Sequence, residues 1–428
     1  MSGRQTHPKN NQIFKRPPIE NLIKTTYTVN ARSIRHSRKE PLMHPHSPIH
    51  CIIPPHMLKE IADNGTPAQK DMAVSTMKTS EQLRGSRRAL AELGKATMWA
   101  RASVSAAIGG KERTIYDAKN GSTLPGTIIR SENDPPVADV AVNEAFDGSG
   151  ITYDLFKEVY NRNSIDGNGL ELNSTVHYQK GYDNAFWDGQ QMVYGDGDEN
   201  LPVSERLFNR FTIALDIIGH ELTHGVTQYE AELAYFQQPG ALNESMSDVF
   251  GSLVKQYQRR QMADQADWII GEGLFTSNVN GIGIRTMKAP GTAYNDPVLG
   301  KDPQPAHMKD YVNTFSDNGG VHINSGIPNH AFYLMALEMG GFAWEKAGQI
   351  WYVTLKDKLS KNSNFQQCAS FTYQVAGDLF GPGSLEQQAV KNGWAGVGLS
   401  VDGGGTPPTE PGGCLESLLR LIGAAPAK

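Results

Sequence analysis

Residues 217–224 read Ile217-Ile218-Gly219-His220-Glu221-Leu222-Thr223-His224, which places the pattern H-E-x-x-H inside an apolar run compatible with a helix. Residues four apart lie on the same face of a helix, so His220 and His224 can offer imidazole nitrogens to one metal ion. Glu221 follows the first histidine and can reach a metal-bound water without binding the metal itself. The pattern is also typical of a surface pair of histidines, so further residues must decide.

A second segment follows after a short gap and reads Gly240-Ala241-Leu242-Asn243-Glu244-Ser245-Met246-Ser247-Asp248. We expect Glu244 to begin a second helix and to supply a carboxylate oxygen as a third ligand. Two imidazoles, one carboxylate and an open fourth position form the His₂Glu arrangement of catalytic zinc sites. Asp248, one turn beyond Glu244, can accept the second ring N–H of a ligating histidine and fix its tautomer. The alternative is an ordinary acidic helix face.

A third block, D-N-G-G-V-H from Asp317 to His322, completes an ordered series with H-E-x-x-H and with N-E-x-x-S-D at Asn243 to Asp248. In this order and spacing the blocks resemble the thermolysin-like family of zinc metallopeptidases (the gluzincins), and matching blocks run from about Tyr116 to Val397. The resemblance implies an α+β fold of two lobes, with a β-rich N-terminal lobe and a mainly α-helical C-terminal lobe. The zinc helix would lie at the floor of the cleft between them.

The overall composition excludes several classes of protein. A chain of 428 residues is long enough to bury a sizeable core in two or more structural units. The net charge of −5 is small, so no global field favours nucleic acid as a partner. Three cysteines, Cys51, Cys368 and Cys414, cannot form a complete disulfide framework, although one bridge remains possible. No apolar run reaches the ~18 residues of a transmembrane helix.

The first fifty residues favour a cytoplasmic protein, with export by another route as the alternative. Met1 to Glu20 is polar, contains Pro17 and Pro18, and lacks the apolar centre of a signal peptide. Residues 1–50 hold nine Lys/Arg against two Glu, which would also suit an organelle transit peptide. Because scattered prolines interrupt an amphipathic helix, we interpret the segment as a disordered basic extension.

Order is expected to begin at Cys51, just before Pro54 and Pro55. Residues 57–64 suit a short helix ended by Gly65, and a longer helix should run from Pro67 towards Arg84. This block resembles the short propeptide of protealysin-like precursors. A flexible segment of small residues follows, and we expect maturation to cleave between about residues 95 and 112.

Five segments are therefore expected along the chain. They are a disordered extension over residues 1–50, a propeptide over 51–108, a β-rich catalytic lobe including the zinc helix over 109–235, a helical catalytic lobe over 236–402, and a linker with a short amphipathic tail over 403–428. Short strands are expected throughout residues 113–200.

The resemblance also implies roles for residues outside the ligand set. Glu221 would be the general base, and Tyr235 and His322 would donate hydrogen bonds to the oxyanion that forms when water attacks a peptide carbonyl. Asp317 would orient His322. Asn243 would lie beside the ligands together with Asp248.

Substrate contacts follow from the same resemblance. The extended segment Asn184-Ala185-Phe186-Trp187 would pair with a peptide backbone as an added strand, and Arg285 would grip the peptide beyond the cleaved bond. The pocket after that bond would be lined by bulky apolar residues. They are Phe208, Phe211, Ile217, Ile270 and Ile284. We therefore expect cleavage before hydrophobic residues such as Leu or Phe.

One departure from the family concerns calcium. Larger members hold a pair of calcium ions beside the zinc helix, and Asp216, Asp267 and Glu272 stand here at matching positions. Lys255 and Ile269 stand where two carboxylates are expected. Because a lysine adds positive charge where a dication needs negative charge, we expect that the double site is lost and that Lys255 pairs with Asp216. The sequence leaves open a site for a single Ca²⁺.

Cys51 suggests a further hypothesis. Its thiolate would occupy the open zinc position and keep the precursor inactive. The alternative is that Cys51 is a small buried apolar residue.

The sequence thus predicts a zinc-dependent neutral metalloendopeptidase acting on proteins or peptides, made as a precursor that its own propeptide inhibits, and monomeric. Two alternatives are a non-catalytic peptide-binding protein on a peptidase scaffold and an aminopeptidase or other metallohydrolase. Retention of Glu221 and of every ligand argues against the first, and an open strand-pairing edge argues against the second.

Overall fold

A mixed six-stranded sheet forms the N-terminal part of the fold in the computed structural model, which describes residues 50–97 and 110–401. The strand order is β1-β5-β6-β4-β2-β3. The strands are β1 (His50–Cys51), β2 (Arg113–Asp117), β3 (Thr127–Ser131), β4 (Leu172–Val176), β5 (Ala185–Trp187) and β6 (Met192–Tyr194). The pairs β2–β4 and β4–β6 are parallel, whereas β1–β5, β5–β6 and β2–β3 are antiparallel. The predicted N-terminal extension, cleavage segment and C-terminal tail lie wholly or mostly outside the described residues.

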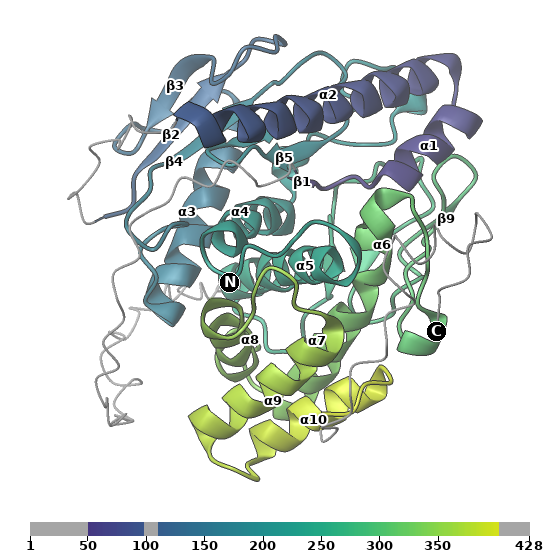
Figure 1. The fold of residues 1–428 in the computed structure, drawn as a ribbon. Coiled ribbons are helices and arrows are strands. Elements are labelled where there is room, and N and C mark those ends of the chain that lie inside the picture. The colour runs from purple at the N-terminus through teal and green to yellow at the C-terminus, as the bar shows by residue number, and fades with distance from the viewer. Residues whose placement is uncertain (1–49, 98–109, 402–428) are drawn as a thin grey trace, which may run out of the picture. The chain divides into compact units, whose positions relative to one another are not determined.

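Two helices follow β1, as the sequence predicts. Helix α1 (Pro55–Asn64) ends at Gly65, and α2 (Pro67–Thr97) continues well past the expected end near Arg84. The start of α2 is fixed by a reciprocal cap, in which Gln69 Oε1 accepts from Thr66 N at 2.7 Å and Thr66 Oγ1 accepts from Gln69 N at 3.4 Å. Figure 1 shows α2 running beside the strands of the sheet. Thr79 of α2 hydrogen bonds Gln179, which ties the helix to the loop after β4.

The stretch between β3 and β4 contradicts the prediction of strands alone, because it forms the long helix α3 (Val140–Tyr160). Gly148, Ser149 and Gly150 lie in its middle and lower the helix propensity that the sequence displays. The structure explains the first glycine: a Cβ on Gly148 would lie 2.4 Å from Cδ1 of Ile218. Close packing of α3 against the helix that carries Ile218 therefore requires a glycine at position 148. The same glycine lowers the helix propensity of the segment, which is why the sequence did not predict α3.

Two long helices lie side by side at the centre of Figure 1, α4 (Leu215–Tyr229) and α5 (Gln237–Arg259). A Cβ on Gly219 would lie 3.1 Å from the Cα of Gly251, and a Cβ on Gly251 would lie 2.4 Å from the carbonyl oxygen of Asp216. The helices thus touch backbone to backbone. Helix α5 begins seven residues before Glu244, where the sequence predicted its start. Pro239 stands in the first turn, where a missing N–H breaks no helical hydrogen bond.

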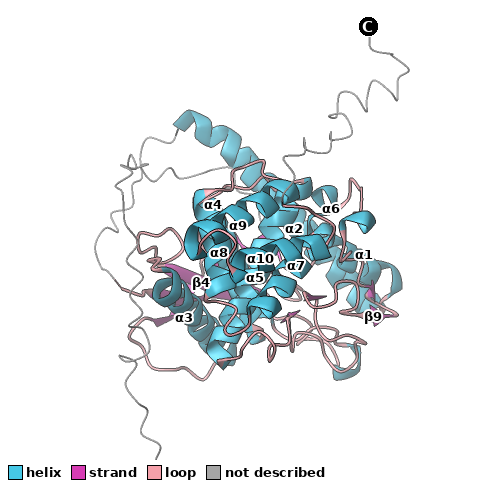
Figure 2. Ribbon diagram, turned by 90° about the horizontal axis from the view of Figure 1, so that it is seen from below, coloured by secondary structure: helices cyan, strands magenta, loops and turns pink. Residues whose placement is uncertain are grey.

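The remaining described residues form short ladders, 3₁₀ turns and a helical C-terminal part. The ladders pair β7 (Ile269–Ile270) with β8 (Arg285–Thr286) and β9 (Asn295–Asp296) with β10 (Gly300–Lys301). The 3₁₀ turns are η2 (Val203–Glu205), η3 (Phe211–Ile213) and η4 (Met308–Asp310). The helices are α6 (Asp317–Asn324), α7 (Gly326–Met339), α8 (Lys346–Asp357), α9 (Phe365–Phe380) and α10 (Leu385–Gly396). Figure 2 shows α7 to α10 gathered beside α5. Strands followed by helices give the expected α+β fold.

Apolar side chains from the described elements form one large continuous core and one small cluster at the sheet edge. The small cluster comprises Cys51, Tyr178, Tyr182, Phe186 and Val193. Among the described helices, none combines the length and the apolar character that crossing a bilayer would need.

The contact between α4 and α5 gives a first prediction. Gly251→Ala should lower the free energy of unfolding by about 1–3 kcal/mol, because the backbone atoms facing the new methyl group cannot rotate away. It should also weaken metal binding by separating the two helices. Thermal unfolding and metal titration measure both effects. Gly110→Ala is the control, since a Cβ there meets nothing within 4 Å. Equal stability of the two variants would contradict the close contact.

Candidate active site

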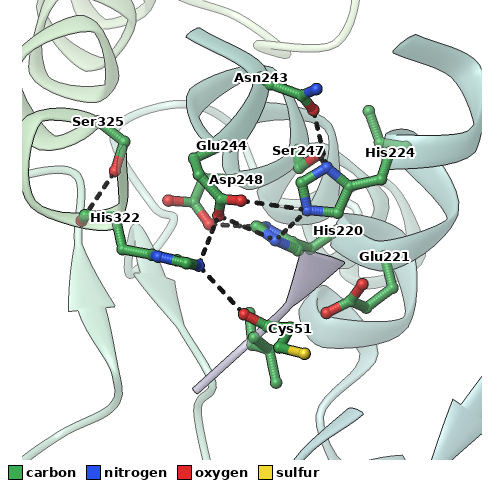
Figure 3. Close-up of polar contacts among 12 residues, drawn as sticks. Cys51, His220, Glu221, His224, Asn243, Glu244, Ser247, Asp248, His322 and Ser325 are labelled. Carbon is green, nitrogen blue, oxygen red and sulfur yellow. Dashed lines mark hydrogen bonds and ion pairs between the residues drawn. The ribbon is translucent and has the colours of Figure 1, made fainter. Parts of the chain in front are cut away.

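Three side chains from α4 and α5 converge on one point. His220 and His224 project from one face of α4, and Glu244 projects from α5 towards them (Figure 3). One ligand atom from each residue lies within 4.8 Å of the others, and all three residues are buried. The Nε2 atoms of the two histidines are 3.0 Å apart, and each lies 3.5 Å from a carboxylate oxygen of Glu244.

The hydrogen bonds of the two imidazoles decide what this point can hold. His220 Nδ1 lies 2.8 Å from Asp248 Oδ1, and His224 Nδ1 lies 2.8 Å from Asn243 Oδ1. Because these acceptors take an Nδ1–H proton, both Nε2 atoms carry lone pairs that face each other. Glu244 Oε2 is buried and accepts no hydrogen bond. Two imidazole lone pairs and a carboxylate around one buried point fit a cation such as Zn²⁺.

Asp248 links the ligands to the residue expected to grip the substrate. Arg285 donates to both of its carboxylate oxygens, at 2.8 and 2.9 Å, and Asn329 donates to Oδ2 at 2.8 Å. Burial acts to raise the pKa of Asp248, but the charges of Arg285 and His220 outweigh burial and lower it. Asp248 is therefore ionised and can hold the His220 ring in one orientation.

Glu221 is fully buried beside the strand β5. Its Oε2 accepts from the backbone N–H of Trp187 at 3.0 Å, whereas Oε1 has no hydrogen-bond partner. Burial, followed by the charge of Glu244, raises the pKa of Glu221 well above its ordinary value. One fixed oxygen and one open oxygen suit a group that accepts and returns a proton.

Two hydrogen-bond donors face the ligands from the other side. Tyr235 Oη donates to Glu244 and lies 3.1 Å from His322 Nε2. His322 Nδ1 lies 2.5 Å from Asp317 Oδ1, as expected for an orienting carboxylate. Burial acts to lower the pKa of His322, but the negative charges of Asp317 and Glu244 outweigh burial and raise it. The ring therefore favours its charged form, in which both nitrogens are donors.

Strand β1 lies across this site. It pairs antiparallel with β5, so that Cys51 faces Phe186, and Ile52 N donates to Ala185 O at 3.2 Å. The chain continues over Asn184, which accepts from Ile53 N at 2.9 Å and donates to Ile53 O at 3.4 Å. The segment before α1 thus takes the position in which the sequence predicted an added peptide strand.

Two side chains of the site contact the same segment through its carbonyl groups. Arg285 Nη1 donates to Ile52 O at 3.3 Å, and His322 Nε2 lies 3.1 Å from Cys51 O (Figure 3). The carbonyl oxygen of Cys51 therefore points to the place where the donors and ligands meet.

The thiol of Cys51 contradicts the predicted zinc switch. Its Sγ lies 3.8 Å from Ser80 Oγ of α2 and belongs to the small cluster around Tyr178 and Tyr182. Side chains of a strand stand roughly perpendicular to the sheet, whereas carbonyl groups lie near its plane, so the carbonyl of Cys51 can face the ligands while its thiol does not. Cys51 instead fills the alternative role of a small buried residue.

The predicted pocket residues are all buried in the large core. They are Phe208, Phe211, Ile217, Ile270 and Ile284. Ile52 is fully buried in the same core. Phe186 differs, because its ring packs in the small cluster with Cys51, its partner across the β1–β5 pair, and not in the large core.

Several supporting residues were missed in the sequence. Ser247 lies 3.0 Å from His224 Nδ1, Asn329 binds Asp248, and Gln304 donates to the carbonyl oxygen of His322 at 2.8 Å. Ser247 lies within the quoted block, where its helical spacing from Asn243 would have indicated it. Asn329 and Gln304 reach the site only through the tertiary fold.

Comparisons with known proteins agree with this geometry. Residues 78–228 match the model of the thermolysin metallopeptidase catalytic domain, and residues 231–399 match that of the thermolysin metallopeptidase α-helical domain. The chain belongs to the thermolysin family of metallopeptidases. It is a zinc metalloendopeptidase.

Three similar proteins illustrate the relationship. An extracellular metalloprotease of Pectobacterium carotovorum is 49% identical over 83% of this chain and 97% of its own length. The protease PrtS of a Photorhabdus strain is 47% identical over 82% of this chain and 92% of its own. The solved precursor of protealysin, a metalloproteinase from Serratia proteamaculans, superposes with a TM-score of 0.73 at 51% identity, covering 82% of this chain and 100% of that one. As its name states, that structure is of a precursor.

These relatives correct the expected location. The Pectobacterium protein and a Serratia marcescens relative, 43% identical over 69% of this chain and 79% of its own length, are both named extracellular. Their names point to secretion and contradict the cytoplasmic location inferred from the polar N-terminus.

Lys255 of the peptidase takes the position predicted for it. Its Nζ lies 2.8 Å from both Asp216 and Asp267, 3.7 Å from Glu272, and 2.7 Å from the carbonyl oxygen of Ile269. Burial acts to lower the pKa of Lys255, but Asp216 and Asp267 raise it, so the ammonium group stays charged. This ion cluster joins the start of α4 to the end of α5.

The cluster gives a second prediction. Lys255→Met should lower the free energy of unfolding by about 3–5 kcal/mol, because it leaves the buried carboxylate of Asp216 without its cation. Thermal unfolding measures the change. Lys356→Met serves as the matched control, since the side chain of Lys356 is 46% exposed and pairs with Asp357 at 3.5 Å. A similar small loss in both variants would show that the cluster contributes little.

Proposed function

We propose that this zinc metalloendopeptidase is made as a self-inhibited precursor, with residues 51–108 as its propeptide, and that it cleaves before hydrophobic residues. The observation that carries the proposal is the strand β1, which binds along β5 and presents Cys51 O to His322. A segment that fills the peptide-binding edge of its own protein excludes a substrate from that edge.

The bound segment also supports the orientation of a substrate peptide, which would run antiparallel to β5 as β1 does. Ala185 and Asn184 bind the backbone of Ile52 and Ile53, while Arg285 binds the carbonyl between them. These contacts involve only backbone groups of the bound segment, so peptides of many sequences can make them. Selectivity must then come from the buried apolar residues that would surround the side chain in the position of Ile52.

The chemistry follows from the placement of the polar groups. Zinc held by His220, His224 and Glu244 would supply a water of lowered pKa and would polarise the substrate carbonyl. Glu221 takes the proton of the attacking water at its open Oε1 and returns it to the leaving nitrogen. Tyr235 and His322 donate hydrogen bonds to the carbonyl oxygen as negative charge develops on it. Asp317 keeps the His322 ring turned towards that oxygen.

Calcium is not required in this proposal. The ammonium group of Lys255 already pairs with Asp216 and Asp267, and Arg259 also pairs with Asp267, so a dication there would meet positive charge. The zinc helix is therefore expected to keep its stability in the presence of a calcium chelator.

The proposed reaction gives a third prediction. Glu221→Gln should lower kcat for a quenched peptide by about 10²–10⁴-fold, because the proton acceptor is lost, while KM changes little. Zinc content serves as the control and should remain one ion per chain. A chelator of zinc should abolish the wild-type activity. In a random peptide library, cleavage before Leu, Phe or Ile is expected. A preference for charged residues after the bond would contradict the apolar pocket.

His56 makes the inhibition sensitive to pH. It follows the proline pair at the start of α1, and its Nε2 lies 3.3 Å from Tyr294 Oη, while Nδ1 is buried without a partner. Burial lowers the pKa of His56 to about 4. Asp317 opposes this shift, and the charges of His322 and Arg285 strengthen it. A free histidine has a pKa of about 6.5, so the docked propeptide binds fewer protons than the released one between these values.

This environment gives a fourth prediction. Docking of the propeptide should be strongest above about pH 6.5 and should weaken as the pH falls towards 4, on the order of tenfold between pH 8 and pH 5. Hydrogen exchange of the Ile52 and Ile53 amides in the full-length Glu221→Gln chain, corrected for intrinsic rates, measures it. His56→Gln keeps a hydrogen-bonding group that does not titrate, and should remove most of the pH dependence. An unchanged dependence in that variant would exclude His56 as its source.

A further inference from the structure

Two buried carboxyl groups adjoin the residues proposed to bind the substrate. Asp183 directly precedes Asn184 and is only 3% exposed. Asp198 is fully buried in the turn after β6. The Oδ1 atom of each residue is shielded from solvent and has no hydrogen-bond partner. An ionised carboxylate oxygen without a partner is costly in a protein interior, so this arrangement needs a cause.

The two aspartates lie on loops that are in direct contact. Gly195, three residues before Asp198, donates its N–H to the carbonyl oxygen of Asn184 at 2.9 Å. A Cβ on Gly195 would lie 1.8 Å from the carbonyl oxygen of Tyr182, so the loops meet backbone to backbone. A shift of either loop therefore displaces the other.

Each aspartate is also tied to one further part of the site. Asp198 Oδ2 accepts from the backbone N–H groups of Leu207 and Phe208, at 2.6 and 2.9 Å, and Phe208 is a predicted wall of the pocket. The N–H of Asp183 donates to Thr76 Oγ1 of the propeptide helix α2 at 3.1 Å. One oxygen of Asp198 is thus hydrogen bonded in a way that suits an anion, whereas Oδ1 of Asp183 accepts no hydrogen bond.

The charges around the two carboxyl groups indicate which of them holds a proton more readily. Burial, followed by the charge of Asp198, raises the pKa of Asp183 well above its ordinary value. Burial also raises the pKa of Asp198, but the two N–H groups and the charge of Arg206 oppose that shift. Among the described residues, no lysine, arginine or histidine forms an ion pair with Asp183. Asp183 is therefore the member of the pair that holds a proton more readily.

We propose that Asp183 is protonated at neutral pH and donates a hydrogen bond to Asp198, and that this acid–carboxylate pair positions Asn184 and Phe208 for peptide binding. The proposal rests on the proposed peptidase function, for which it adds two positioning residues. One proton satisfies both orphaned oxygens, which explains why two buried carboxyl groups tolerate each other. Loss of the proton would place two like charges in one buried site and push the loops apart.

The effect should fall on binding of the peptide more than on the chemical step. Asn184 makes two hydrogen bonds to the backbone of Ile53, one residue beyond the position that follows the cleaved bond. Glu221 and the proposed zinc ligands lie on α4 and α5, whereas Asp183 and Asp198 lie on loops outside these helices. KM should therefore respond to the pair, while kcat stays nearly constant.

The kinetic test compares three variants of the zinc-loaded enzyme obtained from the full-length chain. Asp183→Asn supplies the same donor without titrating, so its KM should stay within about twofold of wild type at pH 7. Asp183→Ala leaves Asp198 without its donor and should raise KM about tenfold at every pH, with kcat nearly unchanged. Asp188→Asn, at the other end of β5 where the carboxylate accepts from Gln190 and Gln191, is the matched control and should behave as wild type. Equal KM values for Asp183→Asn and Asp183→Ala would overturn the proposal.

A spectroscopic test decides the protonation state without any activity. In the full-length Glu221→Gln chain at pH 7, the infrared difference between that chain and the same chain carrying Asp183→Asn should contain the carbonyl stretch of one protonated carboxylic acid. Absence of this band would overturn the proposal, as would binding of a cation that the Asp183→Asn substitution abolishes. If the protein hydrolysed no peptide but showed the band, the proposed function would fail and the proton assignment would stand.

Discussion

The active site depends on how closely α4 and α5 approach each other. Gly219 and Gly251 let the two backbones touch, and the contact lies one residue from His220. That distance brings Glu244 of one helix within reach of both histidines of the other, so the ligand set is a property of helix packing rather than of any loop. A larger residue at the contact would move the carboxylate away from the imidazoles together with Asp248, which orients one of them.

In the proposed precursor, the same geometry would make inhibition a consequence of substrate recognition. Peptide binding here relies on the side-chain amide of Asn184, on the backbone carbonyl of Ala185 and on Arg285, whose other contacts are to the Asp248 carboxylate. Any extended chain can use these groups, including the segment that precedes α1. Its attachment to two helices that pack against the catalytic unit raises its effective concentration at the edge. A thiol–metal bond is then unnecessary, and the alternation of a strand directs Cys51 Sγ into the small cluster instead.

Residues in sequence-local patterns could be predicted, and residues joined only by tertiary structure could not. The i, i+4 spacing of His220 and His224 and the block around Glu244, read together with the block at Asp317 to His322, predicted the three residues that converge in the structure. Helix α3 was missed because Gly148 and its neighbours lower helix propensity, although packing against Ile218 requires that glycine. Asn329 and Gln304 carried no signal, since each lies in a segment of ordinary composition far along the chain from its partner. The direction of the Cys51 side chain depends on strand register, which the sequence leaves open.

Buried charge is handled in three different ways around this site, and the differences follow from what each group must do. Asp248 must remain an anion to hold His220, and a bidentate arginine keeps it ionised. Asp216 must join α4 to the end of α5, and Lys255 supplies a cation that is part of the chain and cannot diffuse away. In the proposed reaction Glu221 would change its protonation, and it alone of the three has an oxygen with neither a cation nor a hydrogen bond. A permanent partner for that oxygen would fix its proton affinity and remove the residue from the reaction.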